Sequence, residues 1–308
     1  MPELMARIPD VPIYCTANGV KSLKGRYHQD WNFVTVKTGD TLDVGNGKQF
    51  IFIEAPMLHW PDSMFAYLTG DAVLFSNDAF GQHYASENLF NDLVDQNELY
   101  EEAIKYYANI LTPFSSFVTR KINEVLSLNV PVDIIATSHG VIRREDPTQI
   151  VTKYLEWADS YQENRIALIY DTMWNGTRRM AEAITEGIHA VDDSVDVRLF
   201  KMSERDKNDV VTGIFKSKAV LFGSPTVNKG ILTAMAALIE EVKGLKLTNK
   251  KAAAFGCYGW SGESVSILNT QLKEAGFELA GDGIKALWNP DDKSLEAARG
   301  TERSLPLL

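Results

Sequence analysis

The sequence is poor in cysteine, in basic residues and in long apolar runs. Its 308 residues include only Cys15 and Cys257, too few for a disulfide framework and typical of a protein from the reducing cytoplasm. Lys and Arg number 31 against 41 Asp and Glu, and phosphate contacts need clustered cations, which argues against a nucleic-acid partner. No apolar run approaches the roughly 18 residues of a membrane helix, and residues 1–10 lack the apolar core of a secretion signal. We therefore expect a cytoplasmic protein with no nucleic-acid or membrane partner.

The first half of the chain has the features of a mixed α+β domain. Short apolar segments alternate with turn signals rich in glycine, asparagine and aspartate, which predicts a largely antiparallel meander. Helix-like stretches with apolar residues on one face follow the meander. The predicted strands cover residues 33–36, 41–44, 50–53, 72–75 and 132–135, and the predicted helices cover residues 99–111, 118–126 and 148–158.

The second half has a more regular pattern, in which strand-like and helix-like segments alternate. Continuous apolar runs such as residues 166–170 are typical of strands buried on both faces, and the alternation predicts a doubly wound parallel sheet of the α/β class. Thr177 is placed to cap the first helix. We predict two domains, residues 1–162 and 163–308. The expected strands are 166–170, 195–202, 219–223 and 251–256, and the expected helices are 177–189, 210–216, 231–243 and 265–275.

The loop after the first of these strands has the composition of an anion site. Ligands of open α/β sheets bind outside the carboxyl ends of the strands. This loop offers hydroxyls, a side-chain amide and a glycine ahead of a helix N-terminus, which favours a phosphate monoester. A triphosphate site would need a Gly-x-x-x-x-Gly-Lys-Ser/Thr motif, which the sequence lacks. The candidate phosphate ligands are Thr172, Met173, Trp174, Asn175, Gly176 and Thr177.

Two further loops follow neighbouring strands and carry aromatic residues. Trp174, Tyr258 and Trp260 are suited to cover a flat heterocycle, while backbone groups read its edges. For any one loop alone, the residues are equally explained as turn formers and packing; three such loops at three strand ends favour a cofactor. The candidates in these loops are Ser224, Pro225, Thr226 and Asn228, then Gly256, Tyr258, Gly259, Trp260 and Gly262.

The three loops, in this order, resemble flavodoxin and more closely the flavodoxin-like half of the flavodiiron family of A-type flavoproteins, which includes flavorubredoxins. The resemblance rests on Tyr-Asp-Thr-Met-x-x-x-Thr at 170–177, Gly-Ser-Pro-Thr-Val-Asn at 223–228 and Phe-Gly-x-Tyr-Gly-Trp-Ser-Gly at 255–262. It implies an FMN cofactor, with the phosphate on residues 172–177 and the ring between the other two loops.

The first half places three potential metal ligands after predicted strands. Imidazoles together with a carboxylate that can bridge two ions suit a borderline metal, although each residue alone is more simply a hydrogen-bonded loop side chain. The resemblance, which extends over nearly the whole chain, implies a metallo-β-lactamase-like domain in which His59 binds one iron, His139 binds the other and Asp78 bridges them. His28 and His83 match no ligand motif and are interpreted as structural or surface residues.

The family also takes metal ligands from a His-x-Glu-x-Asp-His motif. Residues 1–30 contain no such motif, and residues 1–9 resemble the helix that follows it. We therefore expect a metallo-β-lactamase-like domain without its N-terminal part and a diiron site that is incomplete in this chain.

The resemblance implies an FMN-dependent oxidoreductase that passes electrons from a rubredoxin-like donor through FMN to a diiron site, which reduces nitric oxide or dioxygen. It also implies a homodimer. No Cys-x-x-Cys pair follows the flavin domain, so the donor is expected to be a separate chain. The alternative is an FMN-binding electron carrier without metal chemistry. A metallo-β-lactamase-like hydrolase ranks lower, because a hydrolase has no use for a flavin domain. No catalytic residue is assigned.

Overall fold

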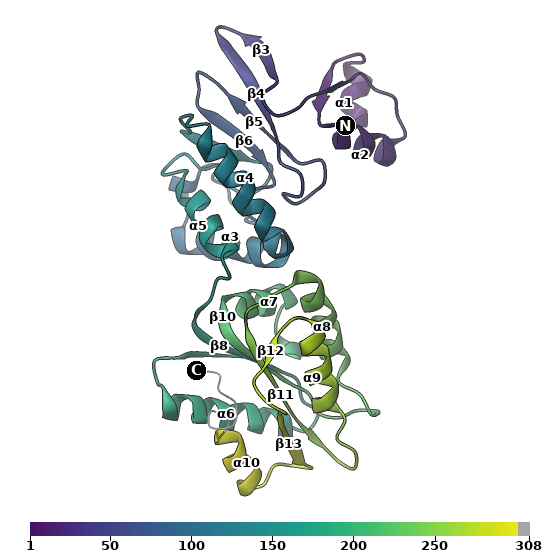
Figure 1. Cartoon of the computed structure of the whole chain (residues 1–308), viewed down its shortest axis with the longest axis vertical. Coiled ribbons are helices and arrows are strands. Elements are labelled where there is room, and N and C mark those ends of the chain that lie inside the picture. The colour runs from purple at the N-terminus through teal and green to yellow at the C-terminus, as the bar shows by residue number, and fades with distance from the viewer. Residues whose placement is uncertain (301–308) are drawn as a thin grey trace. The chain divides into compact units, whose positions relative to one another are not determined.

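The chain consists of two compact units in the computed structural model, which describes residues 1–300 (Figure 1). The first unit is Met1–Asp159 and the second begins at Ser160, a few residues before the predicted boundary. The end of the predicted second domain, residues 301–308, lies outside the described residues. Within residues 1–300, every helix is too short or too polar to cross a membrane.

A five-stranded sheet forms the centre of the first unit. Strands β3 to β6 pair antiparallel in chain order, as the meander predicted, and β7 joins parallel to β6. Strand β5 was not among the predicted strands. Its residues are apolar on both faces of the sheet, so the sequence shows no alternation of polar and apolar residues. The strands are β3 (Thr41–Gly45), β4 (Lys48–Glu54), β5 (Met64–Leu68), β6 (Val73–Asn77) and β7 (Ile134–Thr137).

Three helices of the first unit, α3, α4 and α5, pack around an aromatic cluster. Tyr107 and Trp157 each lie within 6 Å of the Tyr154 ring, and Phe80 lies 4.9 Å from it, measured between ring centroids. The predicted helix 99–111 is in fact an α-helix that continues as a π-helical turn, Tyr107–Leu111, and a 3₁₀ turn, Thr112–Phe114. The helices are α3 (Gln96–Tyr106), α4 (Ser115–Ser127) and α5 (Gln149–Ala158), with a 3₁₀ turn at Asn91–Leu93.

A small parallel pair of strands precedes this sheet. Strands β1 (Ile13–Cys15) and β2 (Phe33–Thr35) are joined by helix α2 (Ala17–Tyr27), which the sequence did not predict. Thr16 caps α2, because its hydroxyl accepts a hydrogen bond from the Gly19 amide at 3.0 Å. Helix α1 is Pro2–Arg7, in the segment expected to be helical.

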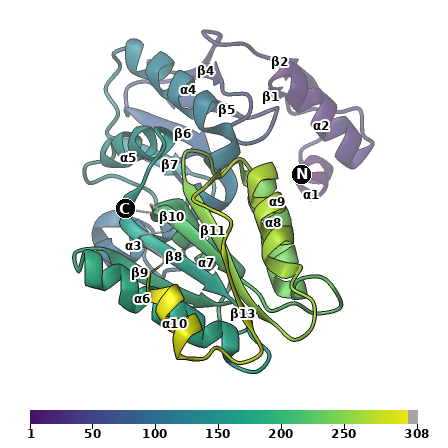
Figure 2. The ribbon, with the colours of Figure 1, turned by 60° about the horizontal axis from the view of Figure 1, so that its bottom comes forward.

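The second unit is the predicted doubly wound fold (Figure 2). Its six strands are all parallel, in the order β12-β11-β10-β8-β9, with β13 also paired to β11. Helices α6 and α10 cover one face of the sheet, and α7, α8 and α9 cover the other. The elements are β8 (Glu163–Tyr170), α6 (Gly176–Val191), β9 (Asp196–Lys201), a 3₁₀ turn (Met202–Glu204), α7 (Lys207–Lys216), β10 (Ser217–Gly223), α8 (Thr233–Leu245), β11 (Lys251–Tyr258), α9 (Ser264–Glu274), β12 (Glu278–Leu279), β13 (Ile284–Leu287) and α10 (Asp292–Arg299).

Lys250 is a buried cation at the end of this sheet opposite the predicted site. Its ammonium donates hydrogen bonds to the carbonyl oxygens of Tyr161, Phe215 and Ser217 at 3.1, 2.8 and 2.6 Å. Burial lowers the pKa of Lys250 to about 8, against the attraction of Glu163.

This burial makes stability depend on pH. The unfolded chain keeps the Lys250 proton to about pH 10.5 and the folded chain releases it near pH 8, so the unfolded state binds more protons between these values and stability rises with pH. We expect the free energy of unfolding of the wild type, minus that of Lys250→Met, to rise by about 2 kcal/mol over this window. Urea titrations at several pH values measure it, with exposed Lys273→Met as the control. A flat difference would contradict the prediction.

Candidate functional site

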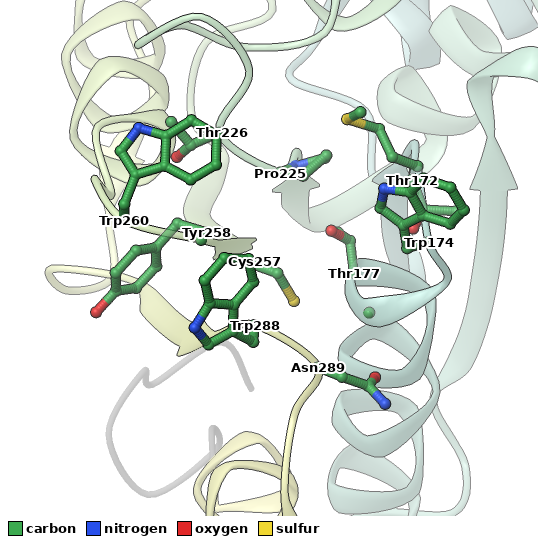
Figure 3. A pocket seen from close by; sticks show the side chains of 13 residues that line it. Thr172, Trp174, Thr177, Pro225, Thr226, Cys257, Tyr258, Trp260, Trp288 and Asn289 are labelled. Atoms are coloured by element: carbon green, nitrogen blue, oxygen red, sulfur yellow. The ribbon is translucent and has the colours of Figure 1, made fainter.

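Three loops of the second unit enclose a cavity of about 440 Å³ at the carboxyl ends of β8, β10 and β11, within the size range of cofactor pockets (Figure 3). Trp260 and Tyr258 lie on one side, Trp174 and Thr172 lie on the other, and Pro225 lies between them. Ten of the predicted residues line the cavity: Thr172, Met173, Trp174, Gly176, Thr177, Pro225, Thr226, Tyr258, Gly259 and Trp260.

One end of the cavity is built for an anion. Asn175 takes a left-handed conformation (φ 62°) and is the N-cap residue of α6, so the prediction that Thr177 caps this helix is wrong: Thr177 lies inside its first turn. Thr172 Oγ1 and Thr177 Oγ1 are both buried, and neither bonds to a nitrogen or oxygen atom among the described residues, although the weakly bonding Cys257 thiol lies beside Thr177. A Cβ on Gly176 would approach Cys257 Sγ to 2.9 Å, so only glycine leaves this turn undisturbed. The two hydroxyls and the helix N-terminus together fit a phosphate.

Aromatic side chains stand on both sides of the cavity. Trp174 and Trp260 are 87% and 86% exposed, values that are unusual for tryptophan and leave their faces free to cover a ring. The Trp260 and Trp288 rings are 6.4 Å apart between centroids. Gly259 passes so close to Trp288 that an added Cβ would lie 2.9 Å from the indole.

Hydrogen bonds within the protein hold the loops in place. Thr226 Oγ1 donates to Ser264 Oγ at 3.0 Å, and the Thr226 amide donates to the Cys257 carbonyl oxygen at 2.9 Å. Ser224 Oγ accepts from the Leu232 amide at 3.0 Å, which ties the loop after β10 to the start of α8. The cavity walls are therefore fixed before any ligand arrives.

Five predicted residues lie in these loops but outside the cavity lining. Ser224 is fully buried below the floor, and a Cβ on Gly256 would approach the Ser224 carbonyl oxygen to 2.0 Å. Gly262 packs against the Tyr258 ring, where an added Cβ would lie 3.2 Å from ring atoms. Asn175 and Asn228 adopt left-handed turns. These residues shape the loops that carry the lining residues.

Three lining residues were not predicted. Cys257 is 7% exposed, and burial raises the pKa of its thiol to about 11, although the neighbouring Thr177 hydroxyl opposes this rise. Trp288 and Asn289 follow β13, a strand that the sequence analysis did not identify. Asn289 Oδ1 accepts a hydrogen bond from Arg179 on α6 at 2.9 Å. A tryptophan after a short apolar segment was the available signal for a fourth loop at this edge.

In the first unit, the three predicted metal ligands meet. Asp78 follows β6, and its two carboxylate oxygens lie 3.4 Å from His59 Nε2 and from His139 Nε2 respectively. The hydrogen bond with His59 lowers the pKa of Asp78, while partial burial works against this. His83, interpreted as structural or surface, is exposed, and its ring lies 5.3 Å from that of His139.

The described residues supply only part of a metal site. Asp78 with His59 and His139 offers each of two ions one imidazole and one carboxylate oxygen, fewer than the two histidines and one carboxylate of a typical non-haem iron site. Across residues 1–300, no three His, Cys, Asp or Glu side chains are arranged to hold one metal ion. These residues alone therefore do not fit a complete iron centre.

Comparisons with known proteins agree with this architecture. Residues 168–300 match the family model described as flavodoxin, and residues 1–140 match the model of the ODP family beta lactamase. The chain is 60% identical to an anaerobic nitric oxide reductase flavorubredoxin of Klebsiella pneumoniae and 59% identical to one from Escherichia coli, each over 304 residues, or 98% of the chain. It spans 63% of the length of these relatives.

Two solved structures match nearly the whole chain. The rubredoxin oxygen:oxidoreductase of Desulfovibrio gigas is 33% identical with a TM-score of 0.94, over 99% of this chain and 76% of the other. The flavodiiron protein of Giardia intestinalis is 32% identical with a TM-score of 0.90, over 96% of this chain and 72% of the other. The predicted combination of a metallo-β-lactamase-like region and a flavodoxin-like domain is thereby confirmed, and the chain belongs to the flavodiiron protein family.

Proposed function

We propose that the chain is an FMN-dependent oxidoreductase that uses electrons from a rubredoxin-like donor to reduce nitric oxide or dioxygen. The observation that carries the flavin assignment is the pair of buried hydroxyls of Thr172 and Thr177, which bond to no nitrogen or oxygen atom among the described residues, beneath an aromatic-walled cavity. The names of the relatives, which refer to nitric oxide, oxygen and rubredoxin, support the substrates and the donor.

In this proposal the FMN phosphate binds to the hydroxyls of Thr172 and Thr177 and to the backbone amides of residues 175–177. The loops after β10 and β11 would hold the isoalloxazine ring, and the exposed indoles of Trp174 and Trp260 would be placed to shield it from water. When bound, FMN supplies a group that takes electrons singly and holds two. Ser264 keeps Thr226 oriented toward the cavity.

The experiment that tests the flavin assignment is a titration of the purified chain with FMN and with riboflavin, followed by flavin fluorescence. We expect quenching by both and tighter binding of FMN, because only FMN reaches the hydroxyls at the start of α6. If the fluorescence of FMN stays unquenched, the flavin assignment fails.

The role of the first unit is tested by its iron content. We propose that His59, Asp78 and His139 would hold the iron: each imidazole would serve one of two ions, and the Asp78 carboxylate would serve both. An FMN-binding electron carrier without metal chemistry is the second candidate, favoured by the single imidazole that these residues offer each ion. Near two irons per chain, with consumption of nitric oxide or dioxygen, supports the reductase; bound flavin with essentially no iron supports the carrier.

Assembly and location are also proposals. The exposed indoles of Trp174 and Trp260 at the cavity mouth support a homodimer in which a second copy covers them. Both cysteines are buried and unpaired, which supports a reducing compartment such as the cytoplasm. Light scattering of the flavin-loaded chain measures the assembly.

The aromatic wall leads to a separate prediction. Trp260→Ala should weaken FMN and riboflavin alike, by about tenfold, because the indole contacts the ring that both ligands share. Fluorescence titration measures both affinities. Trp60→Ala, which removes an exposed indole from the first unit, is the control and should change neither. A loss confined to FMN would place Trp260 at the phosphate and contradict the arrangement.

A further inference from the structure

A second cavity, of about 50 Å³, lies within the first unit between its sheet and helices α4 and α5. Strands β5, β6 and β7 contribute one wall, and the two helices contribute the other. Its lining is apolar apart from Thr148, whose hydroxyl donates to Asp146. The lining residues are Phe65, Leu74, Phe80, Ile122, Val125, Leu126, Val132, Ile135, Thr148 and Val151.

The size and the lining of this cavity determine which molecules it can hold. A space of this volume has room for a water molecule, but water needs two to four polar partners, and this lining offers none that is free. Charged and polar ligands are excluded for the same reason. An uncharged diatomic gas loses little on leaving water and needs no hydrogen bond, so it fits both the volume and the surface.

The cavity runs from the surface to the interior. Leu126 is 54% exposed and Val132 is half-buried, which marks the outer end. At the inner end, Phe65, Phe80 and Ile135 are each no more than 2% exposed. The outer end of the cavity, between α4 and the start of β7, therefore lies at the surface of the unit.

The inner end reaches the turn that carries Asp78. Gly81 closes this turn, because its amide donates to the Asp78 carbonyl oxygen at 3.1 Å, and Tyr154 fixes Phe80 by accepting its amide hydrogen at 3.0 Å. Within the one turn, the Phe80 ring lines the cavity while the Asp78 carboxylate contacts the imidazoles.

We propose that this cavity is a binding site for an uncharged diatomic gas, which it holds one turn of chain away from the Asp78 cluster, formed by His59, Asp78 and His139. That the gas is nitric oxide or dioxygen as substrate rests on the proposed function. The binding itself rests on the cavity alone and requires neither flavin nor iron.

Xenon and dioxygen are the probes, and the methyl groups of the lining report on them. In methyl-labelled full-length chain, xenon should shift the signals of Leu74, Ile122, Val125, Ile135 and Val151, and dissolved dioxygen should broaden the same signals by paramagnetic relaxation. Val151→Phe fills the space and should abolish both effects. Leu155→Phe adds the same bulk to α5 at a half-buried position outside the lining, so it should leave both effects in place.

Val125→Ala gives an independent test in case Val151→Phe does not fold. Removing two methyl groups enlarges the cavity, so xenon should saturate the remaining signals at lower pressure. Absence of xenon shifts at these methyls in the wild type, or shifts that persist in a folded Val151→Phe variant, would overturn the proposal. If the chain binds xenon in this cavity but does not quench FMN fluorescence, the gas site stands and the proposed function fails.

Discussion

Thr177→Ala should weaken binding of FMN by about 10- to 100-fold and leave the affinity for riboflavin unchanged. The Thr177 hydroxyl is buried in the first turn of α6 and bonds to no nitrogen or oxygen atom among residues 1–300. The Cys257 thiol beside it is only a weak partner, so the hydroxyl is available to donate to a phosphate oxygen. A hydrogen bond to a charged group contributes about 1.5–3 kcal/mol, which corresponds to this loss of affinity. Parallel fluorescence titrations with the two flavins measure the difference.

Two variants separate this role from a structural one. Thr177→Ser keeps the hydroxyl and should restore most of the FMN affinity. Thr185→Ala removes a hydroxyl from the same helix, but that hydroxyl donates to the Ala181 carbonyl oxygen at 3.0 Å, so flavin binding should not change. If Thr177→Ala weakened riboflavin as much as FMN, Thr177 would act through the shape of the loop and the phosphate would bind elsewhere.

The fold and the cavity of the second unit could be predicted closely, because the sequence patterns that indicate them lie within short segments of the chain. A strand buried on both faces needs a continuous apolar run, and β8, β10 and β11 each contain one. Parallel strands end at one edge, so the loops that follow them were expected to meet, and ten residues in them share a cavity. Strand β13 is only four residues long and pairs with β11, which is distant in sequence, so its short segment before Trp288 was a weak signal. Trp288 and Asn289 were missed for that reason.

The first unit was harder to predict because its structure depends on contacts that are distant in sequence. Strand β5 is recognised by its pairing with β4 and β6, since its own residues are apolar on both sides. No motif around His83 predicts a ligand, yet packing with Tyr106 and His139 brings it beside the Asp78 cluster. Conversely, the family resemblance and the strand-end positions predict that His59, Asp78 and His139 lie together, and the sheet brings them into contact.

Gly256→Ala should destabilise the second unit by about 3 kcal/mol. Gly256 lies in β11 beside the first residue of the loop after β10, and an added Cβ would lie 2.0 Å from the Ser224 carbonyl oxygen. That atom belongs to the backbone, and Ser224 itself is fully buried and hydrogen-bonded to the Leu232 amide, so neither side can move aside cheaply. The strain falls on the two loops that form the cavity, so flavin affinity should drop with stability.

Gly244→Ala is the matched control, because a Cβ at Gly244 meets no atom within 4 Å. This glycine is exposed near the end of α8, where alanine should stabilise the helix by about 0.5–1 kcal/mol. The two glycine-to-alanine changes therefore have opposite expected signs in one unit, and urea titration with flavin fluorescence as the readout measures both. If the two variants were equally stable, the prediction would be wrong. The carboxyl ends of β10 and β11 would then separate easily, and the cavity would not be preformed as its hydrogen bonds indicate.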